Sequence, residues 1–306
     1  MKKAVLAITG GTGFVGTTLI RLAQSQGHRI RALTRSQQTA QEGVEWIPGS
    51  LDRPESLRTL VEGSDAVIHV AGVVNAPDRA GFEAGNVSGT LAMIEATRDA
   101  GVRRFVHVSS LSAREPELSD YGWSKAKAES LVQASALDWT IVRPPWIFGP
   151  GDADTLDLFK MARRGFVVLP PNGQISVIEV SDLARLLLAV LPASETKTQI
   201  YEADDGAEGG WSHSNFGKAI GAAVDKDVAT IPAPAPFLRL AAGLDGFFRG
   251  SGARLTADRV RYFCHPDWVI DPLRRPPASL WKPAVETRIG LKSTAHAYVE
   301  AGWLKR

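Results

Sequence analysis

The sequence has only one cysteine, Cys264, among its 306 residues. A single cysteine excludes an intrachain disulfide and favours a reducing compartment, so we expect a cytoplasmic protein. The chain also lacks an uninterrupted apolar run of about 18 residues, which argues against a membrane span. Its formal net charge is only +2, without a dense basic run, and its histidines do not stand at metal-ligand spacing. We therefore expect neither a nucleic-acid partner nor a metal site.

What the sequence does contain is a glycine-rich segment near its beginning. Thr9 to Gly16 read Thr-Gly-Gly-Thr-Gly-Phe-Val-Gly, after an apolar run and before a helix-like stretch. Within it, Gly10, Gly13 and Gly16 are three residues apart. In a dinucleotide-binding loop, the first glycine permits a tight turn and the second lets the backbone approach the pyrophosphate. The third lets the helix pack closely on the strand.

The helix after this loop directs free backbone N–H groups and the positive end of its dipole at the phosphates, so the loop needs no lysine. Spaced glycines alone are equally typical of a structural turn, but the preceding strand and the following helix favour a dinucleotide site. The residues that we assign to this site are Gly10, Thr12, Gly13, Phe14, Val15 and Gly16.

The first half of the chain alternates short β-branched runs with stretches of helical length. This alternation predicts an α/β fold, a Rossmann-type doubly wound parallel sheet with crossover helices. The expected strands are 4–8, 29–34, 44–47, 66–70, 105–108 and 140–142, and the expected helices are 15–26, 54–61, 80–100 and 120–136.

After Pro144 the pattern changes to loops rich in proline and glycine that leave the sheet. A strand at 177–180 and a helix at 182–190 then predict a return to the sheet. We therefore expect a dinucleotide-binding domain of residues 1–148 and about 176–203. The remainder, about 149–175 and 204–306, is expected to form a smaller, C-terminal substrate-binding lobe.

Candidate catalytic residues follow the strand expected at 105–108. Tyr121 and Lys125 occur in the string Tyr-Gly-Trp-Ser-Lys and are four residues apart, so a helix would place them on one face. A cation beside a phenol favours the phenolate form, which suits Tyr121 to proton transfer near neutral pH. Ser110 ends the preceding strand, where its hydroxyl can hold a substrate carbonyl. Such a pair alone is usually a surface helix contact, but Tyr121 is the only one of the four tyrosines with lysine at this spacing.

These segments together resemble the extended or atypical branch of the short-chain dehydrogenase/reductase superfamily, close to the NAD-dependent epimerase/dehydratase group. The resemblance covers nearly the whole chain, and its motifs are highly specific in combination. It rests on residues 9–16, 65–72, 86–90, 108–110, 121–125 and 143–152.

The resemblance implies a role for each matching residue. Tyr121 would donate or accept the proton, Lys125 would hold the nicotinamide ribose, and Ser110 would polarise the substrate carbonyl. Asn86 would belong to the helix beneath them. The same resemblance places Ala71 and Gly72 on the adenine-ribose side of the cofactor and Pro144 on its nicotinamide side.

The chain departs from the family pattern at two points. Only ten residues separate Ser110 from Tyr121, as in compact members rather than in many extended ones, so Ser112 remains an alternative to Ser110. The family often has an aspartate near the adenine where this chain has Ser50, so we expect Leu51 to supply a backbone contact alone.

The strand expected at 29–34 indicates which cofactor is bound. An acidic residue at its end would bind the adenosine ribose and repel a 2′-phosphate, but no acid occurs until Glu42. Arg35 can instead pair with that phosphate. We therefore favour NADP, with NAD possible if Arg35 merely faces solvent.

Aromatic and apolar residues offer candidates for a substrate surface. Trp123, Trp146 and Phe148 stand near the candidate catalytic residues and suit an apolar or ring-shaped substrate, although ordinary packing explains them equally well. A second apolar group has helical spacing within 236–250 and consists of Phe237, Leu240, Leu244, Phe247 and Phe248. We expect this helix to pack on the lobe or on a second subunit; a lid or a membrane-surface contact is the less favoured alternative.

The leading interpretation is an NADP-dependent oxidoreductase that transfers hydride between nicotinamide and a carbonyl or secondary alcohol of a small molecule. The first alternative is a sugar-nucleotide epimerase or dehydratase that retains NAD. The second is a non-catalytic cofactor-binding scaffold or redox sensor, which the intact Tyr121 and Lys125 disfavour. The protein is expected to be a monomer or a homodimer.

Overall fold

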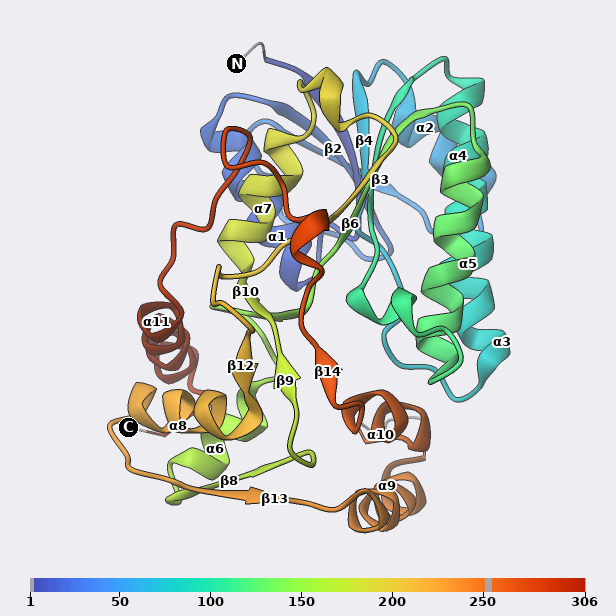
Figure 1. Ribbon diagram of the computed structural model, residues 1–306. Coiled ribbons are helices and arrows are strands. Elements are labelled where there is room, and N and C mark those ends of the chain that lie inside the picture. Colours follow the sequence, from blue (N-terminus) through green and yellow to red (C-terminus); the bar gives the residue numbers. More distant parts are fainter. Residues whose placement is uncertain (1–2, 251–254, 306) are drawn as a thin grey trace. The chain divides into compact units, whose positions relative to one another are not determined.

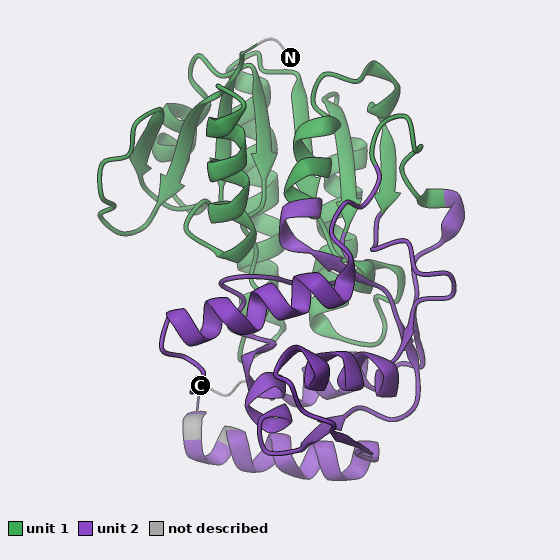
Figure 2. Cartoon of the chain, turned by 90° about the vertical axis from the view of Figure 1, so that its left-hand side faces the viewer, with its two compact units in different colours: residues 1–143, 183–202, 274–281 green, residues 144–182, 203–273, 282–306 purple. Residues whose placement is uncertain are grey.

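The structure is a computed structural model that describes residues 3–250 and 255–305 (Figure 1). The chain forms two compact units (Figure 2). Unit 1 comprises residues 1–143, 183–202 and 274–281, and unit 2 comprises residues 144–182, 203–273 and 282–306. The chain therefore passes between the units several times, and residues 274–281, which we expected in the substrate lobe, belong to unit 1.

Unit 1 is built on a seven-stranded parallel sheet, which confirms the predicted Rossmann-type fold. The strand order is β11-β6-β5-β4-β1-β2-β3, so the connections reverse direction between β1 and β4. In sheets of this kind, ligands bind at the carboxyl ends of the strands beside such a reversal. The strands are β1 (Val5–Thr9), β2 (Arg29–Thr34), β3 (Val44–Pro48), β4 (Ala66–His69), β5 (Arg104–Val108), β6 (Asp138–Arg143) and β11 (Gln199–Glu202).

Helices cover both faces of this sheet. α2, α4 and α5 lie on one face, and α1 and the part of α7 that belongs to unit 1 lie on the other (Figure 1). Leu57, Leu60 and Val61 of α2 are fully buried at helical spacing, as expected of a helix that packs on a sheet. The helices are α1 (Phe14–Ser25), α2 (Pro54–Val61), α3 (Arg79–Phe82), α4 (Gly89–Asp99), α5 (Asp120–Ala134) and α7 (Val180–Ala189).

The segment expected to be one helix at 80–100 is divided in three. A π-helical segment, Glu83–Ser88, separates α3 from α4. π-Helical turns widen the backbone and are frequent at functional sites. This one carries Asn86, whose side chain is buried.

We expected the strand at 177–180 to rejoin the large sheet, and this prediction was wrong. β10 (Val177–Glu179) pairs with β7 (Trp146–Phe148) in a separate two-stranded sheet of unit 2, and β11 is the strand that completes the large sheet. β11 reads Gln-Ile-Tyr-Glu, and its Glu202 is fully buried. A buried acid in a four-residue strand leaves little hydrophobic pattern to recognise.

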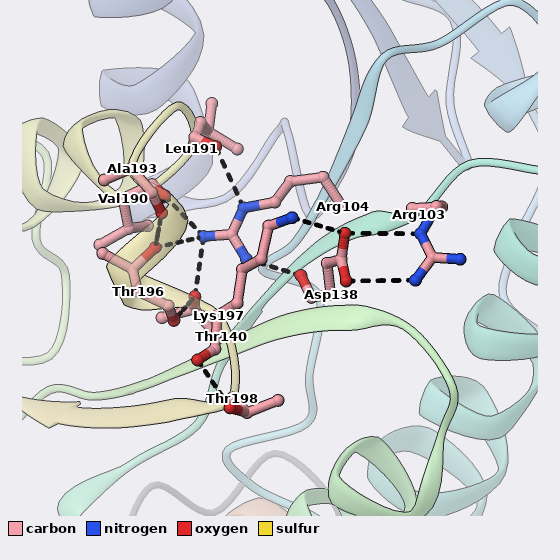
Figure 3. Close-up of polar contacts among 10 residues, drawn as sticks. All are labelled: Arg103, Arg104, Asp138, Thr140, Val190, Leu191, Ala193, Thr196, Lys197 and Thr198. Carbon is pink, nitrogen blue, oxygen red and sulfur yellow. Dashed lines mark hydrogen bonds and ion pairs between the residues drawn. The ribbon is translucent and has the colours of Figure 1, made fainter.

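A buried arginine at the amino end of the sheet connects β5 by hydrogen bonds to β6 and to the chain after α7 (Figure 3). Arg104, the first residue of β5, is only 8% exposed, and burial lowers the pKa of Arg104 to about 10, so it stays charged at neutral pH. Two of its acceptors are carbonyls just beyond the end of α7, where a cation is favourable. Its guanidinium donates hydrogen bonds of 2.6–3.1 Å to Asp138 O, Thr140 Oγ1, Val190 O, Leu191 O and Thr196 Oγ1.

Unit 2 has short strands and a core of its own. Phe148, Phe159, Phe216 and Tyr298 are fully buried in this core, and Tyr298 Oη donates a 2.5 Å hydrogen bond to the Asp152 carbonyl. The strands besides β7 and β10 are β8 (Phe166–Leu169), β9 (Gln174–Ile175), β12 (Trp211–Ser212), β13 (Ala229–Pro232) and β14 (Asp267–Trp268). The helices are α6 (Leu156–Ala162), α8 (His213–Ala223), α9 (Ala235–Arg249), α10 (Ala257–Phe263) and α11 (Thr287–Glu300).

Across residues 3–250 and 255–305, none of the helices combines the length and the apolar character that crossing a bilayer requires.

Candidate active site

The loop after β1 has the close contacts that explain its glycines. Gly10 has a φ of +72°, and a Cβ on it would lie 2.7 Å from the amide nitrogen of Ala71 after β4. A Cβ on Gly16 would lie 2.0 Å from the Gly10 carbonyl oxygen. Neither position admits a side chain, since both distances are shorter than real Cβ contacts. Gly10 therefore provides the tight turn, and Gly16 lets α1 pack against the loop.

Gly13 is different, because a Cβ there would meet a single atom without a severe clash. A Cβ there would meet only the Gly10 carbonyl oxygen at 3.3 Å, and both Gly13 and Thr12 are exposed. Gly13 precedes α1, whose amino terminus has neither a side-chain cap nor an acid in its first turn. Free N–H groups and the helix dipole at such an end favour an anion. The residues present thus fit a dinucleotide pyrophosphate at this end of α1, beside Phe14 and Val15.

The ends of β2 and β3 provide the other polar groups of this edge. Arg35 directly follows β2, is exposed, and forms no hydrogen bond or ion pair with any residue that the structure describes. After β3, the Ser50 hydroxyl donates a short hydrogen bond to the Asp52 carboxylate, and this bond holds the pKa of Asp52 below its usual value. The side chain of Leu51 packs near Gly89 at the start of α4. Asp52 is an acid on this edge that we did not single out in the sequence.

Asn86 connects the loop after β4 to α5. Its Oδ1 accepts a 2.6 Å hydrogen bond from Val73 N, and its Nδ2 donates to Val73 O and to Ser124 Oγ, both at 2.9 Å. The neighbouring Gly72 has little room for a side chain, because a Cβ on it would lie 3.0 Å from Asn86 Oδ1. Ala71 is held by its own amide, which donates to Thr9 Oγ1 at 3.1 Å. One buried amide thus fixes the chain at Val73, next to Gly72, against the helix that carries Tyr121 and Lys125.

Lys125 is buried at the centre of this arrangement. Its Nζ donates a 2.9 Å hydrogen bond to the Val108 carbonyl at the end of β5, and a Cβ on Gly72 would lie 3.6 Å from the same Nζ. Burial lowers the pKa of Lys125 to about 8, although the carboxylate of Glu129 opposes this shift. The ammonium therefore lies at the carboxyl edge of the sheet, between β5 and the loop after β4.

Ser110 caps a 3₁₀-helical turn, Leu111–Arg114, that follows β5, and Ser112 lies within this turn. Ser112 is buried, and its backbone N and its Oγ donate to Ser110 Oγ at 3.2 and 3.0 Å. The turn lies against the start of α5, since a Cβ on Gly122 would be 2.8 Å from Ser112 O. Next to that glycine, the half-buried ring of Tyr121 lies 6.0 Å from the ring of Phe82. The structure thus brings Ser110, Tyr121 and Lys125 to one region of unit 1.

A buried ion network supports this region, and we did not identify it in the sequence. Arg143 lies between two buried acids, with its Nη2 2.6 Å from Glu129 Oε2 and its Nη1 3.3 Å from Glu202 Oε1. Burial alone would lower the pKa of Arg143, but its hydrogen bonds and charge pairing with Glu129 and Glu202 raise it. Ser109 donates to Glu129, and Arg114 pairs with Glu202 at 3.3 Å. The network therefore holds both ends of the segment that carries Ser110.

Two histidines beneath Lys125 are neutral. The rings of His69 and His107 stack 5.5 Å apart, and both are fully buried within the sheet. Burial, reinforced by the charge of Lys125, lowers the pKa of His69 to about 3 and that of His107 well below its usual value. Both rings are therefore uncharged near neutral pH and cannot supply a proton as imidazolium, which leaves Tyr121 as the acid-base candidate.

The four remaining candidates lie in both units. Trp123 belongs to unit 1, where the Arg79 guanidinium lies 3.8 Å from the centre of its ring. Pro144, Trp146 and Phe148 belong to unit 2. Trp146 is half-buried, and its Nε1 donates to Thr155 Oγ1 at 3.1 Å.

Phe148 does not fit the expected substrate surface, because its side chain is fully buried in the core of unit 2. Its ring centre lies 6.4 Å from that of Phe216, and a Cβ on Gly290 would lie 3.0 Å from it. The ring is a packing element. The sequence could not show this, because aromatic residues are common both in cores and beside ligands.

The glycine loop, the parallel sheet and the Tyr-Lys pair define a nicotinamide-dependent enzyme of the extended short-chain dehydrogenase/reductase type. The chain belongs to the NAD(P)H-binding family, which matches residues 10–193. It is accordingly an NAD(P)-dependent oxidoreductase of this superfamily, as we predicted from its motifs.

Two curated relatives match along nearly the whole chain. A ceramide reductase of Caulobacter vibrioides is 34% identical over 99% of this chain and 97% of its own length. A UDP-glucose 4-epimerase of Vibrio cholerae is 24% identical over 98% of this chain and 97% of its own length. The solved UDP-glucose 4-epimerase of Thermus thermophilus, in complex with NAD, shares the fold with a TM-score of 0.73 at 21% identity, covering 97% of this chain and 99% of its own.

Proposed function

We propose that this protein is an NADP-dependent oxidoreductase that transfers hydride between nicotinamide and a carbonyl or secondary alcohol of a small molecule. The observation that carries the proposal is the buried Lys125, hydrogen-bonded to Val108 O and one helical turn after Tyr121. Burying a cation costs folding free energy, so a buried cation usually has a structural or functional role. Here it faces the loop that follows β4, on the edge of the sheet where the cofactor is expected to bind.

The bound cofactor would supply or accept the hydride at nicotinamide C4. In the reductive direction, the Tyr121 hydroxyl donates a proton to the carbonyl oxygen, and the Ser110 hydroxyl donates a hydrogen bond to the same oxygen. The ammonium of Lys125 binds the ribose hydroxyls and stabilises the phenolate that Tyr121 leaves behind. We prefer Ser110 to Ser112 for this role because Ser112 is buried and donates to Ser110 Oγ.

We propose a ceramide-class substrate, that is, a long-chain amide lipid that carries the reacting carbonyl. The support is the similarity to a ceramide reductase along nearly the whole of both chains. The test is a panel of ketones that includes oxidised ceramides, assayed by loss of NADPH absorbance with the wild-type chain and with Tyr121→Phe. Turnover of the lipid ketone by the wild type alone supports the proposal. Equal turnover by both, or turnover of water-soluble ketones only, contradicts it.

The cofactor preference is proposed from Arg35. Its side chain follows β2, is exposed, and pairs with nothing among residues 3–250 and 255–305. A guanidinium in that position can bind a 2′-phosphate through charge-assisted hydrogen bonds. The binding of NADPH and NADH to the wild type and to Arg35→Asp tests this assignment. The aspartate should weaken NADPH binding far more than NADH binding, and an equal effect on both would count against NADP.

A second candidate is a sugar-nucleotide epimerase that retains NAD, which the Vibrio cholerae relative favours. Such an enzyme oxidises its substrate and reduces it again on the same cofactor. Protein purified with tightly bound NAD, and active on a UDP-sugar without added cofactor, would favour this candidate over the first.

A further inference from the structure

The helix α9 has an apolar face that no described residue of unit 2 covers. Among its side chains, Phe247 is 83% exposed, Phe248 79%, Phe237 68%, Leu240 65% and Leu244 52%. These positions recur at intervals of three and four residues, so they form one stripe along the helix. Large apolar side chains are exposed singly on most proteins, but a stripe of five on one helix marks an interaction surface.

The opposite side of α9 attaches the helix to its unit. Ala242 is buried, and Leu238 and Asp245 are half-buried at the matching spacing. Asp245 Oδ2 accepts a 3.0 Å hydrogen bond from Leu255 N, on the chain that leads into α10. α9 and α10 lie side by side (Figure 1). The exposed stripe therefore faces away from α10 on a helix that is held in place.

The charged side chains that the structure describes on α9 are one arginine and one aspartate. Asp245 is half-buried and engaged, because it accepts from Leu255 N. Arg239, by contrast, is exposed beside the stripe. An apolar stripe with the exposed Arg239 beside it and no exposed acid among the described side chains of α9 matches the chemistry of an anionic lipid surface.

We propose that α9 is an interfacial anchor that docks this protein onto an anionic membrane surface. Its length of 15 residues is too short for a span, which needs about 20, so the helix would lie in the plane of the interface. The run before it extends the same surface, since Ile231 is 47% exposed and Pro232, Pro234 and Pro236 are also exposed. A second copy of the chain fits this face less well, because symmetric pairing would bring the exposed Arg239 of both copies to one contact.

The proposal concerns binding to lipid and does not depend on the reaction. The test therefore uses the full-length protein without cofactor or substrate. The protein is mixed with vesicles of phosphatidylcholine, alone or with phosphatidylglycerol, and the bound fraction is measured by flotation. We expect binding that increases with phosphatidylglycerol and weakens with salt.

Variants assign the binding to α9. Phe247→Ser together with Phe248→Ser should lower vesicle affinity about tenfold or more, because both rings leave the interface. Arg239→Gln should lower affinity for the anionic vesicles by about fivefold. The matched control is Ile289→Ser, which removes another exposed apolar side chain (67% exposed) from α11 and should bind as the wild type does.

Three outcomes would overturn the proposal. One is that the wild type does not float with either kind of vesicle. Another is that the double serine variant floats as well as the wild type, which would place the contact elsewhere. The third is that the wild type is a dimer by sedimentation equilibrium and the double variant a monomer, which would assign the stripe to a second copy. Circular dichroism of each variant shows that the fold is retained.

Discussion

Lys125 Nζ donates a 2.9 Å hydrogen bond to the carbonyl oxygen of Val108, the last residue of β5. The bond holds the ammonium at the carboxyl end of the sheet, one turn of α5 after Tyr121. Lys125 lies close to Gly72, and Asn86 fixes that part of the chain through Val73. Three segments distant in sequence thus hold a single buried charge in place.

The first prediction concerns the pH dependence that this burial causes. Burial lowers the pKa of Lys125 from 10.5 to about 8. As pH rises through about 8, the free enzyme loses the ammonium, and kcat/KM, which reports ionisations of the free enzyme, should fall. Lys125→Met should lower kcat/KM at pH 7 about 100-fold. Its profile should also lack this basic limb, and a limb near pH 8 that persists in the variant would assign it to another group.

Substitution of two glycines in the loop after β1 should distinguish an effect on cofactor binding from an effect on folding. Gly13→Ala should fold with only a small loss of stability, because its Cβ meets a single atom, the Gly10 carbonyl oxygen at 3.3 Å. It should weaken cofactor binding about tenfold or more, since the methyl group keeps the pyrophosphate from the backbone N–H groups. Gly16→Ala should destabilise the fold itself, because its Cβ would lie 2.0 Å from Gly10 O. Thermal unfolding and cofactor titration of both variants distinguish the two effects, and equal unfolding temperatures would contradict this account of Gly16.

Arg104 should matter for stability and hardly at all for the cofactor. Arg104→Met leaves buried oxygens on β6 and beyond α7 without a donor and should cost about 3 kcal/mol of unfolding free energy. The control is the adjacent Arg103, whose side chain is 72% exposed beside Asp138 (Figure 3). Arg103→Met should cost less than about 1 kcal/mol. Urea unfolding gives both values, and similar costs for the two variants would refute the role of Arg104.

Asp152 of unit 2 should make stability fall with rising pH. Burial raises the pKa of Asp152 from 3.8 to about 6, so folding favours its protonated form. This contribution is fully present below pH 3.8 and is lost as pH rises through about 6. Asp152→Asn removes the titration, so the stability of this variant relative to wild type should increase between pH 4 and pH 7, by up to about 3 kcal/mol. A difference that stays constant with pH would show that Asp152 does not titrate in this way.

The helices and strands of unit 1 could be predicted from the sequence wherever apolar spacing or a terminating residue marks the element clearly. The bounds of β2 and α2 agree with the expected 29–34 and 54–61, because apolar spacing and an initial proline mark them clearly. The turn of the glycine loop was equally clear from the sequence, because the spacing of its glycines is local, but the contact of Gly10 with Ala71 after β4 was not. β10 and β11 were not, because strands of three and four residues carry too little pattern to show which sheet they join.

The support of the candidate site could not be predicted in the same way. Glu129, Arg143 and Glu202 are far apart in sequence, and only the folded sheet brings these charges together. The one feature of the sequence that pointed to a buried charge pair was the spacing of Lys125 and Glu129, which are four residues apart on α5. The helix near 236–250 was predicted almost to its bounds, but an amphipathic pattern does not show what covers its apolar face.

The most direct test of the central claim follows the hydride itself. NADPH carrying deuterium at the transferable C4 position is incubated with the lipid ketone and either wild-type protein or Tyr121→Phe, and the product is examined by mass spectrometry. We predict one deuterium on the former carbonyl carbon with wild type, and no product with Tyr121→Phe although NADPH still binds. Product without deuterium, or full conversion by Tyr121→Phe, would contradict direct hydride transfer with Tyr121 as the proton donor.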